Sequence, residues 1–487
     1  MSTPRLPHEM WLQVLQDTHR NDLRICLGVC RLWRTFAIRL LFRTVRLYFG
    51  EWASVYTRSG CDCDDCCLSE PDYLNERSLE ILEHIISNPV FASVVKGIVV
   101  HSLYFSYRNE ISLGRLTDAL KVLPHLESFD WHAECQEDIM LAISESCPNL
   151  RHLGLPAFSQ GHNLGSFRQL RSICTTSPSS FCDGYQQRHV AATHEVFLNF
   201  RNATLSRLQL LKCPLDAAPM HLLVQLRELH LVHPRNLGTL DQLFKRLPCL
   251  ETLSLVYVEQ PQADLFTALE KSADMLPQLT SITMSLNETN PLSPGQTHQL
   301  IEFLRGHTSM RALCINNRLP WEVFWQVANA IGNMKSLQAL GLSITSPTPE
   351  SLAFWNPWPP GATPLPKSLE AVSLDMEFAQ VQSFLECLPE LPRLRSFFLC
   401  NECGEDKEQV STRSLAEMMP HLTIVGCAED ICDVRWTTAG IELYHWTRLK
   451  RDTRGRDSFD APFDAWLLRN NPYLASISLP LFGPDGL

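Results

Sequence analysis

The residues best suited to chemistry are cysteines gathered in short runs. The segment Cys61–Cys67 contains four cysteines, and Cys63 and Cys66 have the C-x-x-C spacing of a metal chelate. Cys400 and Cys403 form a second such pair. A zinc site built from these cysteines would need both pairs in one tetrahedron, but a solenoid would separate the pairs by most of its length. A local site of four cysteines within Cys61–Cys67 is sterically cramped. We therefore predict a loop or a conditional disulfide there, with no metal and no cofactor. The alternative, a metal-dependent enzyme using this segment, predicts bound zinc.

Motifs of catalysis are missing from the sequence. It has no glycine-rich phosphate loop, no G-x-S-x-G elbow and no H-E-x-x-H helix. His8 and Glu9 are not followed by the second histidine that the last motif requires. The 17 histidines are scattered, and a lone histidine is more often structural than catalytic. The sequence predicts that the chain is not itself an enzyme.

Charge is distributed unevenly along the chain. The 487 residues carry a formal net charge of −11, which argues against nonspecific binding of nucleic acid. The first fifty residues instead contain eight arginines and no lysine against three acids. A basic segment on an acidic body favours an acidic partner for the N-terminal region, although solvated helix faces give the same pattern.

Composition indicates a folded protein of two to four domains or one long repeat array, with 45% hydrophobic and 20% charged residues. The opening MSTPRLPHE is polar and no apolar signal region follows it. No apolar run is long enough for a spanning helix. We expect reduced cysteines, no membrane association, and a cytoplasmic or nuclear location.

A short pattern, apolar-x-x-apolar-x-apolar, recurs through most of the chain and predicts a strand at each copy. Early copies are Phe42/Val45/Leu47, Val95/Ile98/Val100, Leu126/Phe129/Trp131, Leu150/Leu153/Leu155 and the weak Leu170/Ile173/Thr175. Later copies are Leu205/Leu208/Leu210, Leu226/Leu229/Leu231, Leu250/Leu253/Leu255, Leu279/Ile282/Met284, Met310/Leu313/Ile315, Leu337/Leu340/Leu342, Leu369/Val372/Leu374, Leu394/Phe397/Leu399 and Leu422/Val425/Cys427. The later copies recur every 27 residues on average.

Amphipathic stretches between the triplets predict helices. They are Ala263–Met275, Gln296–Leu304, Pro320–Ile331, Phe378–Leu388 and Ser411–Met418. Gly306 is placed to end the second of these helices as its C′ residue. A strand, a turn and a helix in each unit predict an α/β fold with parallel strands inside and helices outside. A doubly wound α/β domain is the alternative, but equal spacing and a repeated Leu-Pro-x-Leu lead-in favour a solenoid.

These repeats resemble a leucine-rich repeat array over residues 90–430. The family pattern places Asn or Cys three residues after the last leucine, and only Cys213 and Asn287 supply it here. The resemblance therefore implies an uneven horseshoe. The proline-rich stretch 346–367 interrupts it and carries Trp355 and Trp358, which are candidate anchors for a bound protein or, alternatively, pack against the array.

Residues 6–47 carry three apolar periodicities that predict three helices. Met10/Val14 and Trp11/Leu15 repeat at i, i+4, and two further apolar faces follow in the next thirty residues. Pro7 suits a first helical turn, and Asn21 or Asp22 is placed to cap the second helix. Three helices of about ten residues cannot bury all these faces among themselves, so some apolar surface must meet a partner or the rest of the chain.

This N-terminal segment resembles an F-box. Leu6-Pro7-x-Glu9, Asp22-Leu23 and Val29-Cys30-Arg31-x-Trp33 stand in the order that the family uses, with Arg31 in place of the commoner lysine. The resemblance implies docking to the Skp adaptor, and through it to cullin, in a ubiquitin ligase. The chain would be the receptor for an unknown protein substrate, or a scaffold that acts without ubiquitin transfer. The expected docking residues, some of which must instead form the small core, are Leu6, Pro7, Met10, Leu15, Leu23, Leu27, Val29 and Trp33.

The predicted organisation has four parts. A helical module covers residues 4–48, and a linker with the cysteine-rich loop and a helix covers 49–89. Irregular repeats cover 90–430. Residues 431–487 form a capping segment in which Pro462–Arg469 is expected to be a helix and Leu474–Leu479 a strand.

Overall fold

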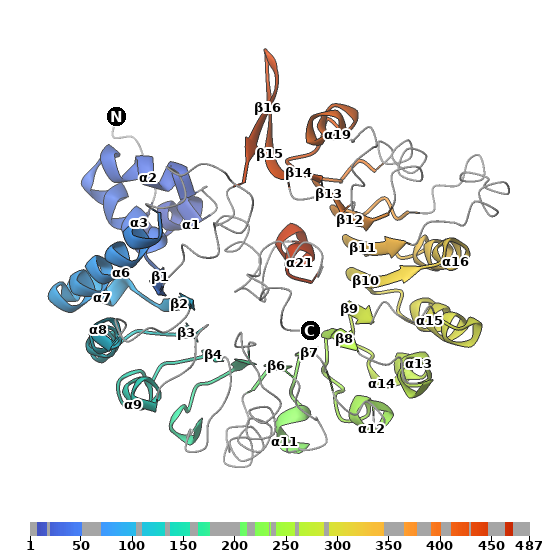
Figure 1. The fold of residues 1–487 in the computed structure, drawn as a ribbon, viewed down its shortest axis with the longest axis horizontal. Helices are drawn as coiled ribbons and strands as arrows, with labels where there is room; N and C mark the ends of the chain where they lie inside the picture. The colour runs from blue at the N-terminus through green and yellow to red at the C-terminus, as the bar shows by residue number, and fades with distance from the viewer. Residues whose placement is uncertain are drawn as a thin grey trace. The chain divides into compact units, whose positions relative to one another are not determined.

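The computed structural model describes most of the chain, in two compact units, Met1–Leu205 and Ser206–Leu487. The described residues are 7–16, 20–50, 70–103, 110–131, 137–155, 164–175, 205–211, 220–232, 234, 240–258, 263–286, 292–344, 365–376, 391–400, 411–427, 430–446 and 463–470. Both units combine a sheet of mainly parallel strands with helices (Figure 1). The predicted α/β class is confirmed.

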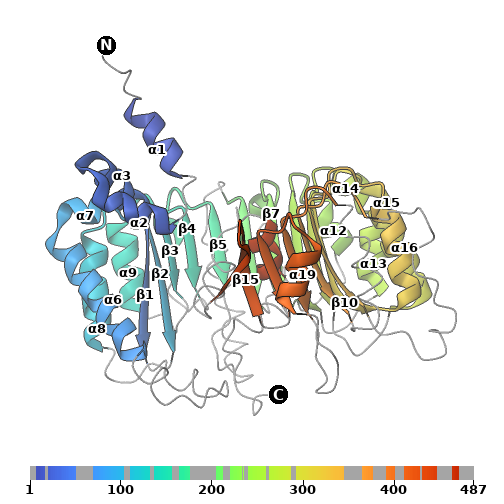
Figure 2. The same cartoon turned by 90° about the horizontal axis from the view of Figure 1, so that it is seen from above.

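The first unit begins with three helices and continues with parallel strands. The helices and strands are α1 (His8–Gln16), α2 (Arg20–Val29), α3 (Arg31–Leu41), β1 (Thr44–Gly50), α6 (Glu70–Ser87), α7 (Pro89–Val94), β2 (Gly97–Leu103), α8 (Glu110–Lys121), β3 (Ser128–Trp131), α9 (Glu137–Ser146), β4 (His152–Leu155), the short η3 (Leu164–Ser166) and β5 (Ser172–Thr175). Strands β1 to β5 pair side by side in chain order. Helices α6, α8 and α9 cover one face of this sheet (Figure 2).

The second unit repeats the same arrangement over a longer stretch. Its elements are β6 (Arg207–Leu211), α11 (Met220–Leu223), β7 (Glu228–Val232), α12 (Leu240–Phe244), β8 (Thr252–Val258), α13 (Ala263–Glu270), α14 (Ser272–Met275), β9 (Ser281–Leu286), α15 (Pro294–Gly306), β10 (Ala312–Leu319), α16 (Trp321–Ile331), β11 (Ala339–Ile344), β12 (Ala371–Asp375), β13 (Ser396–Cys400), α19 (Thr412–Met418), β14 (Ile424–Cys427), β15 (Asp430–Thr437), β16 (Gly440–His445) and α21 (Phe463–Asn470). Strands β6 to β14 are parallel and in chain order. Strands β15 and β16 are antiparallel.

Every predicted triplet coincides with a strand, and its last two positions lie in or beside that strand. Leu253 and Leu255 on β8 show the pattern, since both are fully buried on the face that carries the helices. Side chains alternate between the two faces of a strand, so this pair places Ser254 on the opposite face. The leucine pattern thus determines which face of each sheet packs against helices.

The Leu-Pro-x-Leu lead-in is a tight turn. The N–H of Leu250 donates to the carbonyl of Leu247 at 3.0 Å, and the N–H of Leu394 donates to that of Leu391 at 3.2 Å. Proline follows the first leucine in each case, at the turn position that favours its fixed φ. Each turn leads into a strand, β8 after Leu250 and β13 after Leu394, and the first turn also follows helix α12, which explains why the motif precedes strands.

The end of the second unit differs from the expected cap. Strands β15 and β16 extend the sheet as an antiparallel hairpin. Helix α21, expected as Pro462–Arg469, packs instead against β10, β11 and β12, on the face opposite α15 and α16 (Figure 1). Its Leu467 lies in one apolar cluster with Ala339 of β11 and Phe398 of β13.

Three helix predictions need correction. The stretch Ala263–Met275 forms two helices, because the Ser272 hydroxyl donates to the Leu269 carbonyl at 2.5 Å and competes with the backbone ladder. Gly306 lies inside the last turn of α15, and His307 is the C-cap. Asn21 and Asp22 lie within α2, after its first residue Arg20, rather than at the N-cap position.

Several predicted features fall outside the described residues. They are Leu6, the segment Cys61–Cys67, Cys213, Asn287, Trp355, Trp358, the helix Phe378–Leu388, Cys403 and the strand Leu474–Leu479. Among the helices that are described, none has the length and apolar character needed to cross a bilayer.

Candidate functional site

The three N-terminal helices share a small apolar core. Leu15 of α1, Leu23 and Cys26 of α2, and Phe36 and Leu41 of α3 are all buried. Partly buried side chains close around this core, and the rings of Trp11 and Trp33 lie 5.3 Å apart between centroids. The Arg34 side chain also joins two helices, because its Nε donates to the Leu27 carbonyl at 2.8 Å. The core is enough to orient α1 and α2 against α3.

Two of these helices leave apolar side chains in solvent. Met10 and Val14 on α1 are 47% and 53% exposed, and Ile25 and Val29 on α2 are 69% and 57% exposed. Each pair stands at i, i+4 and therefore shares one helix face. We call these four residues the exposed apolar pairs. Contiguous exposed apolar groups mark interaction surfaces more often than isolated ones do.

The eight residues predicted to dock a partner now separate into groups. Leu15 and Leu23 belong to the internal core, and Leu27 and Trp33 pack around it. Pro7, Met10 and Val29 are exposed, while Leu6 is not described. Val14 and Ile25, which are exposed on the same helices, were not among the eight. The i, i+4 spacing of Met10 and Val14 marked that face, but nothing in the spacing showed which stripe is buried.

A chain of polar side chains crosses the opposite face of the sheet in the first unit. His152 on β4 lies between Asp130 of β3, at 2.6 Å from Nε2 to Oδ1, and Ser172 of β5, at 2.8 Å from Nδ1 to Oγ. All three side chains are buried or nearly so, with Ser172 only 5% exposed. The order carboxylate, imidazole and hydroxyl permits proton transfer. Because the three side chains are largely buried, we interpret them as a structural hydrogen-bond network that links β3, β4 and β5.

Gly154 makes room for this network. It pairs with Asp130 across β3 and β4, and a Cβ atom at this position would collide with the Asp130 carboxylate. The glycine therefore lets the carboxylate lean across β4 to reach His152.

Replacing Gly154 with alanine is expected to lower the free energy of unfolding of the first unit by about 1–3 kcal/mol, through overpacking. Chemical denaturation measures this loss. In an Asp130→Ala background the same change should cost much less, because the colliding carboxylate is gone. Equal losses in both backgrounds would show that the collision with Asp130 is not the cause.

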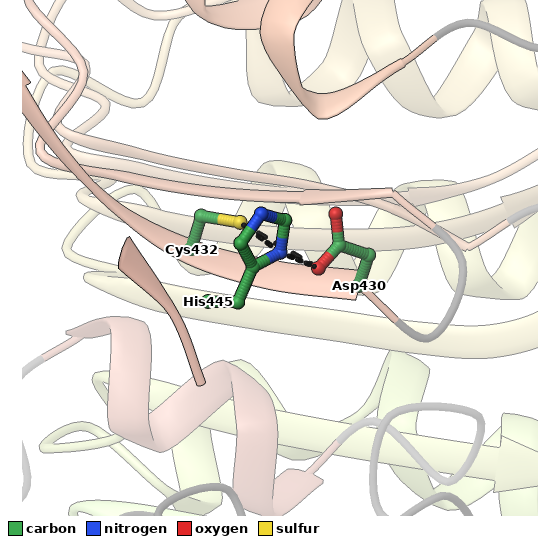
Figure 3. Close-up of side chains that lie close together, drawn as sticks. All are labelled: Asp430, Cys432 and His445. Atoms are coloured by element: carbon green, nitrogen blue, oxygen red, sulfur yellow. Dashed lines mark hydrogen bonds and ion pairs between the residues drawn. The ribbon is translucent and has the colours of Figure 1, made fainter. Parts of the chain in front are cut away.

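A second polar cluster lies on the terminal hairpin of the second unit. Nδ1 of His445 stands 2.7 Å from Oδ1 of Asp430 and 3.2 Å from Sγ of Cys432 (Figure 3). Sγ and Oδ1 are 3.5 Å apart. In the part of the chain that the structure describes, this is the single group of three histidine, cysteine or acidic side chains close enough to share a metal ion.

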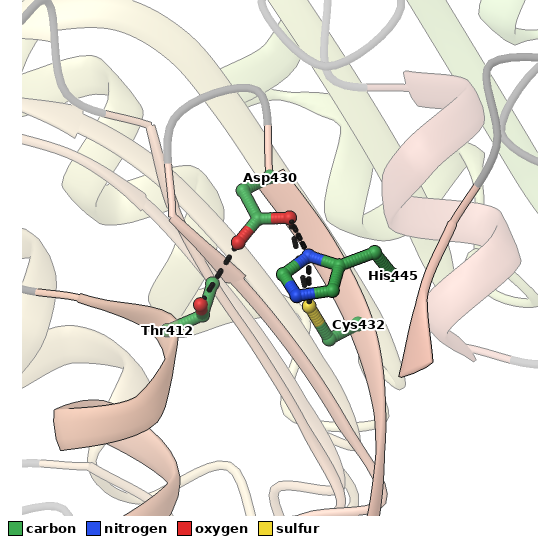
Figure 4. Close-up of polar contacts among 4 residues, drawn as sticks. All are labelled: Thr412, Asp430, Cys432 and His445. Atoms are coloured by element: carbon green, nitrogen blue, oxygen red, sulfur yellow. Dashed lines mark hydrogen bonds and ion pairs between the residues drawn. The ribbon is translucent and has the colours of Figure 1, made fainter. Parts of the chain in front are cut away.

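The cysteine and the aspartate of this cluster have shifted pKa values. Burial raises the pKa of Cys432 to about 12, with a further rise from the Asp430 carboxylate, so the free thiol is protonated at neutral pH. Burial also acts to raise the pKa of Asp430, but hydrogen bonds from His445 and Thr412 outweigh it and the pKa lies below its ordinary value. The Thr412 hydroxyl donates to Oδ2 at 2.9 Å (Figure 4).

Cys400, which the sequence paired with Cys403, is a core residue. It is 7% exposed and lies in the apolar cluster that α21 covers. Its Sγ is 3.8 Å from the Ser373 hydroxyl. This environment suits a small buried side chain rather than a chelate.

A scan against profiles of protein families finds no match to this chain, and a search of curated proteins finds no similar sequence.

Proposed function

We propose that this chain is a substrate receptor of a Skp–cullin–F-box ubiquitin ligase. The N-terminal helices dock the Skp adaptor, and the strands and helices that follow, as an irregular leucine-rich repeat body, bind the protein to be modified. The observation that carries this proposal is the set of exposed apolar pairs on α1 and α2, within the segment that resembles an F-box.

Burial of these side chains against a partner would contribute favourable free energy to docking. Each large apolar side chain removed from water contributes about 1.5–3 kcal/mol. The core beneath them holds α1 and α2 in place before the partner arrives, so little ordering is needed on binding. The same helices carry exposed arginines, Arg24 on α2 and Arg31, Arg34 and Arg39 on α3, which favour an acidic adaptor.

The strand order supports the repeat body. Within each unit neighbouring strands are also consecutive in the chain, whereas a doubly wound domain reverses its strand order at a switch point. The Leu-Pro turns and the buried leucine pairs recur along the chain, with a strand after each turn, as they do in proteins built from stacked repeats. Helix α21 covers β10 to β12, so the target must bind outside that part of the sheet.

The mechanism needs no acid–base residue in this chain. An adaptor that holds the target beside a ubiquitin-charged enzyme turns a bimolecular encounter into a nearly intramolecular one. Binding at two surfaces, one for the ligase and one for the target, is sufficient. The chain is therefore proposed as a non-catalytic subunit.

The double substitution Met10→Asp/Val29→Asp is expected to weaken capture of the purified Skp adaptor by about 10–100-fold, since two charges would be buried in an apolar interface. Binding of the full chain is measured by calorimetry or by co-purification. Leu141→Asp is the matched control, because Leu141 is 57% exposed on α9 of the same unit. This control should bind as the unchanged chain does.

Two other outcomes would change the proposal. Failure of the folded, unchanged chain to bind the adaptor would overturn it. Adaptor binding without recruitment of cullin would keep the docking surface but make the chain a scaffold that acts without ubiquitin transfer.

A further inference from the structure

We propose that Asp430, Cys432 and His445 form a zinc site with three protein ligands. This inference is independent of the docking surface on α1 and α2. It concerns the terminal hairpin, β15 and β16, and helix α19, which contacts both strands.

The backbone brings the three ligands together. Asp430 and Cys432 stand two residues apart on β15, so both side chains point to the same face. His445 on β16 is the direct cross-strand partner of Cys432. Directly opposed residues of an antiparallel pair also share a face. Ordinary hairpin geometry therefore supplies a sulfur, a nitrogen and an oxygen ligand on one surface.

The distances are close to those of a coordinated ion. Zinc bonds of about 2.0–2.3 Å in a tetrahedron place ligand atoms about 3.3–3.6 Å apart. The sulfur lies 3.2 Å from Nδ1 and 3.5 Å from Oδ1, while Nδ1 and Oδ1 stand at 2.7 Å. An ion at the centre requires Nδ1 to move away from Oδ1 by roughly half an ångström and from Sγ by roughly 0.3 Å. The His445 side chain is 66% exposed and free to make that adjustment.

The ligand set selects a class of metal. A thiolate and an imidazole favour zinc and related transition ions, whereas magnesium and calcium take oxygen ligands. Three protein ligands leave a fourth tetrahedral position. The exposed side of the site faces solvent, because His445 and Asp430 have side chains 66% and 42% exposed. Water can fill the remaining position.

Thr412 holds the carboxylate in place. It is the first residue of α19, whose N-cap Ser411 forms a capping box with Ser414. The Thr412 hydroxyl donates to Oδ2 of Asp430 and leaves Oδ1 facing Nδ1 and Sγ (Figure 4). Hydrogen bonds of this kind orient metal ligands and strengthen binding. An ion here would join β15, β16 and, through Thr412, α19.

A catalytic cysteine fits the geometry less well. In a Cys–His–Asp triad, one ring nitrogen faces the thiol and the other faces the carboxylate. Here both Cys432 and Asp430 face the same nitrogen, Nδ1 (Figure 3). His445 cannot accept a proton from the thiol and donate one to the carboxylate through that single atom. Convergence of three donors on a common point is instead what an ion requires.

The test is zinc content of the full chain, and it must separate this site from other thiols. The four cysteines of the segment Cys61–Cys67 are first replaced with serine in all samples. Protein is dialysed against buffered Zn²⁺ and analysed for metal, and Co²⁺ is used in parallel because thiolate coordination gives it a charge-transfer absorption. We expect one zinc per chain and a thiolate–cobalt band.

The variants define the ligands. Cys432→Ser and His445→Ala should each abolish the stoichiometric zinc and the cobalt band. Thr412→Val should weaken zinc binding by about 10–100-fold and retain the band at high cobalt. The matched controls Cys249→Ser and His421→Ala alter a partly buried thiol and an exposed imidazole elsewhere in the same unit, and should change nothing.

His445→Ala keeps the experiment decisive if Cys432→Ser fails to fold, because the exposed His445 side chain contributes little to packing. Zinc should also raise the thermal unfolding midpoint of the chain with the intact site, and should leave that of the His445→Ala variant unchanged. No bound zinc in the chain, or zinc that remains after His445→Ala and Cys432→Ser, overturns the proposal.

Discussion

Replacing Leu467 with alanine should lower the free energy of unfolding of the second unit by about 2–5 kcal/mol. Leu467 is fully buried between α21 and the sheet. Truncation removes its transfer free energy from water and leaves a cavity that the rigid strands beneath cannot fill. This side chain is thus a main attachment of α21 to β10, β11 and β12.

Small residues on the sheet allow α21 to pack closely against it. Small side chains, those of Ala312, Ala339 and Ala371, line the face that α21 covers. At Gly341 a Cβ atom would lie 2.5 Å from Sγ of Cys314 and 3.3 Å from a methyl carbon of Leu467. Larger residues in these positions would hold α21 away from the strands. The neighbouring Trp466 and Leu468 are 6% exposed and extend the same contact.

Urea denaturation followed by circular dichroism measures the effect of Leu467→Ala. Leu467→Met keeps the volume and should cost less than about 1.5 kcal/mol. Val224→Ala removes a side chain that is 45% exposed in the same unit, and should change stability by less than about 0.5 kcal/mol. A loss for Leu467→Ala no larger than that of Val224→Ala would mean that α21 does not pack on the sheet in solution.

The strands were predictable because their signal is local. Each triplet puts two apolar residues on one face within six positions, and the turn before it often carries Leu-Pro. Leu253 and Leu255, for example, alternate along β8, share one face of the strand and are both buried. The helix starting after Pro320 was also predictable, since its apolar residues and proline lie together in sequence.

The polar clusters were not predictable, because they depend on how strands align. Asp130 and His152 are 22 residues apart and meet only through the register of β3 and β4. Cys432 and His445 meet through the register of β15 and β16. Nothing in the spacing of Asp430, Cys432 and His445 resembles a common metal motif. Their proximity needs the hairpin turn between Thr437 and Gly440, where Gly440 adopts a φ of 125°.

The exposed apolar pairs were predictable only in part. Two stripes on α1, Met10/Val14 and Trp11/Leu15, repeat with the same spacing and differ by one position in the chain. Which stripe is buried depends on how the helix is rotated against α3, and one position turns a helix by about 100°. In the structure Leu15 is buried, whereas Met10 and Val14 are exposed. Packing between helices determines which stripe is buried, and the local sequence pattern does not show it.

Lowering the pH to about 4.5 should cost the second unit about 2–3 kcal/mol through His307 alone. His307, the C-cap of α15, is 4% exposed, and its Nε2 lies 3.0 Å from the Ser272 hydroxyl. Burial lowers the pKa of this imidazole to about 4. In the unfolded chain the ordinary pKa is about 6.5. Between these two values the unfolded chain binds the additional proton, so stability is complete above pH 6.5 and falls as the pH approaches 4.

The variant His307→Gln isolates this contribution, because an amide can bond to Ser272 and does not titrate in this range. Carboxylates also titrate below pH 5, so the informative quantity is the difference between the two proteins at each pH. Urea midpoints from pH 7.5 to 4.5 should fall more steeply for the unchanged chain, and the gap should open below about pH 6.5. Parallel curves would mean that His307 is hydrated in the folded protein. They would also mean that the contact between His307 and Ser272 of α14, 3.0 Å from Nε2 to the hydroxyl oxygen, does not exclude water in solution.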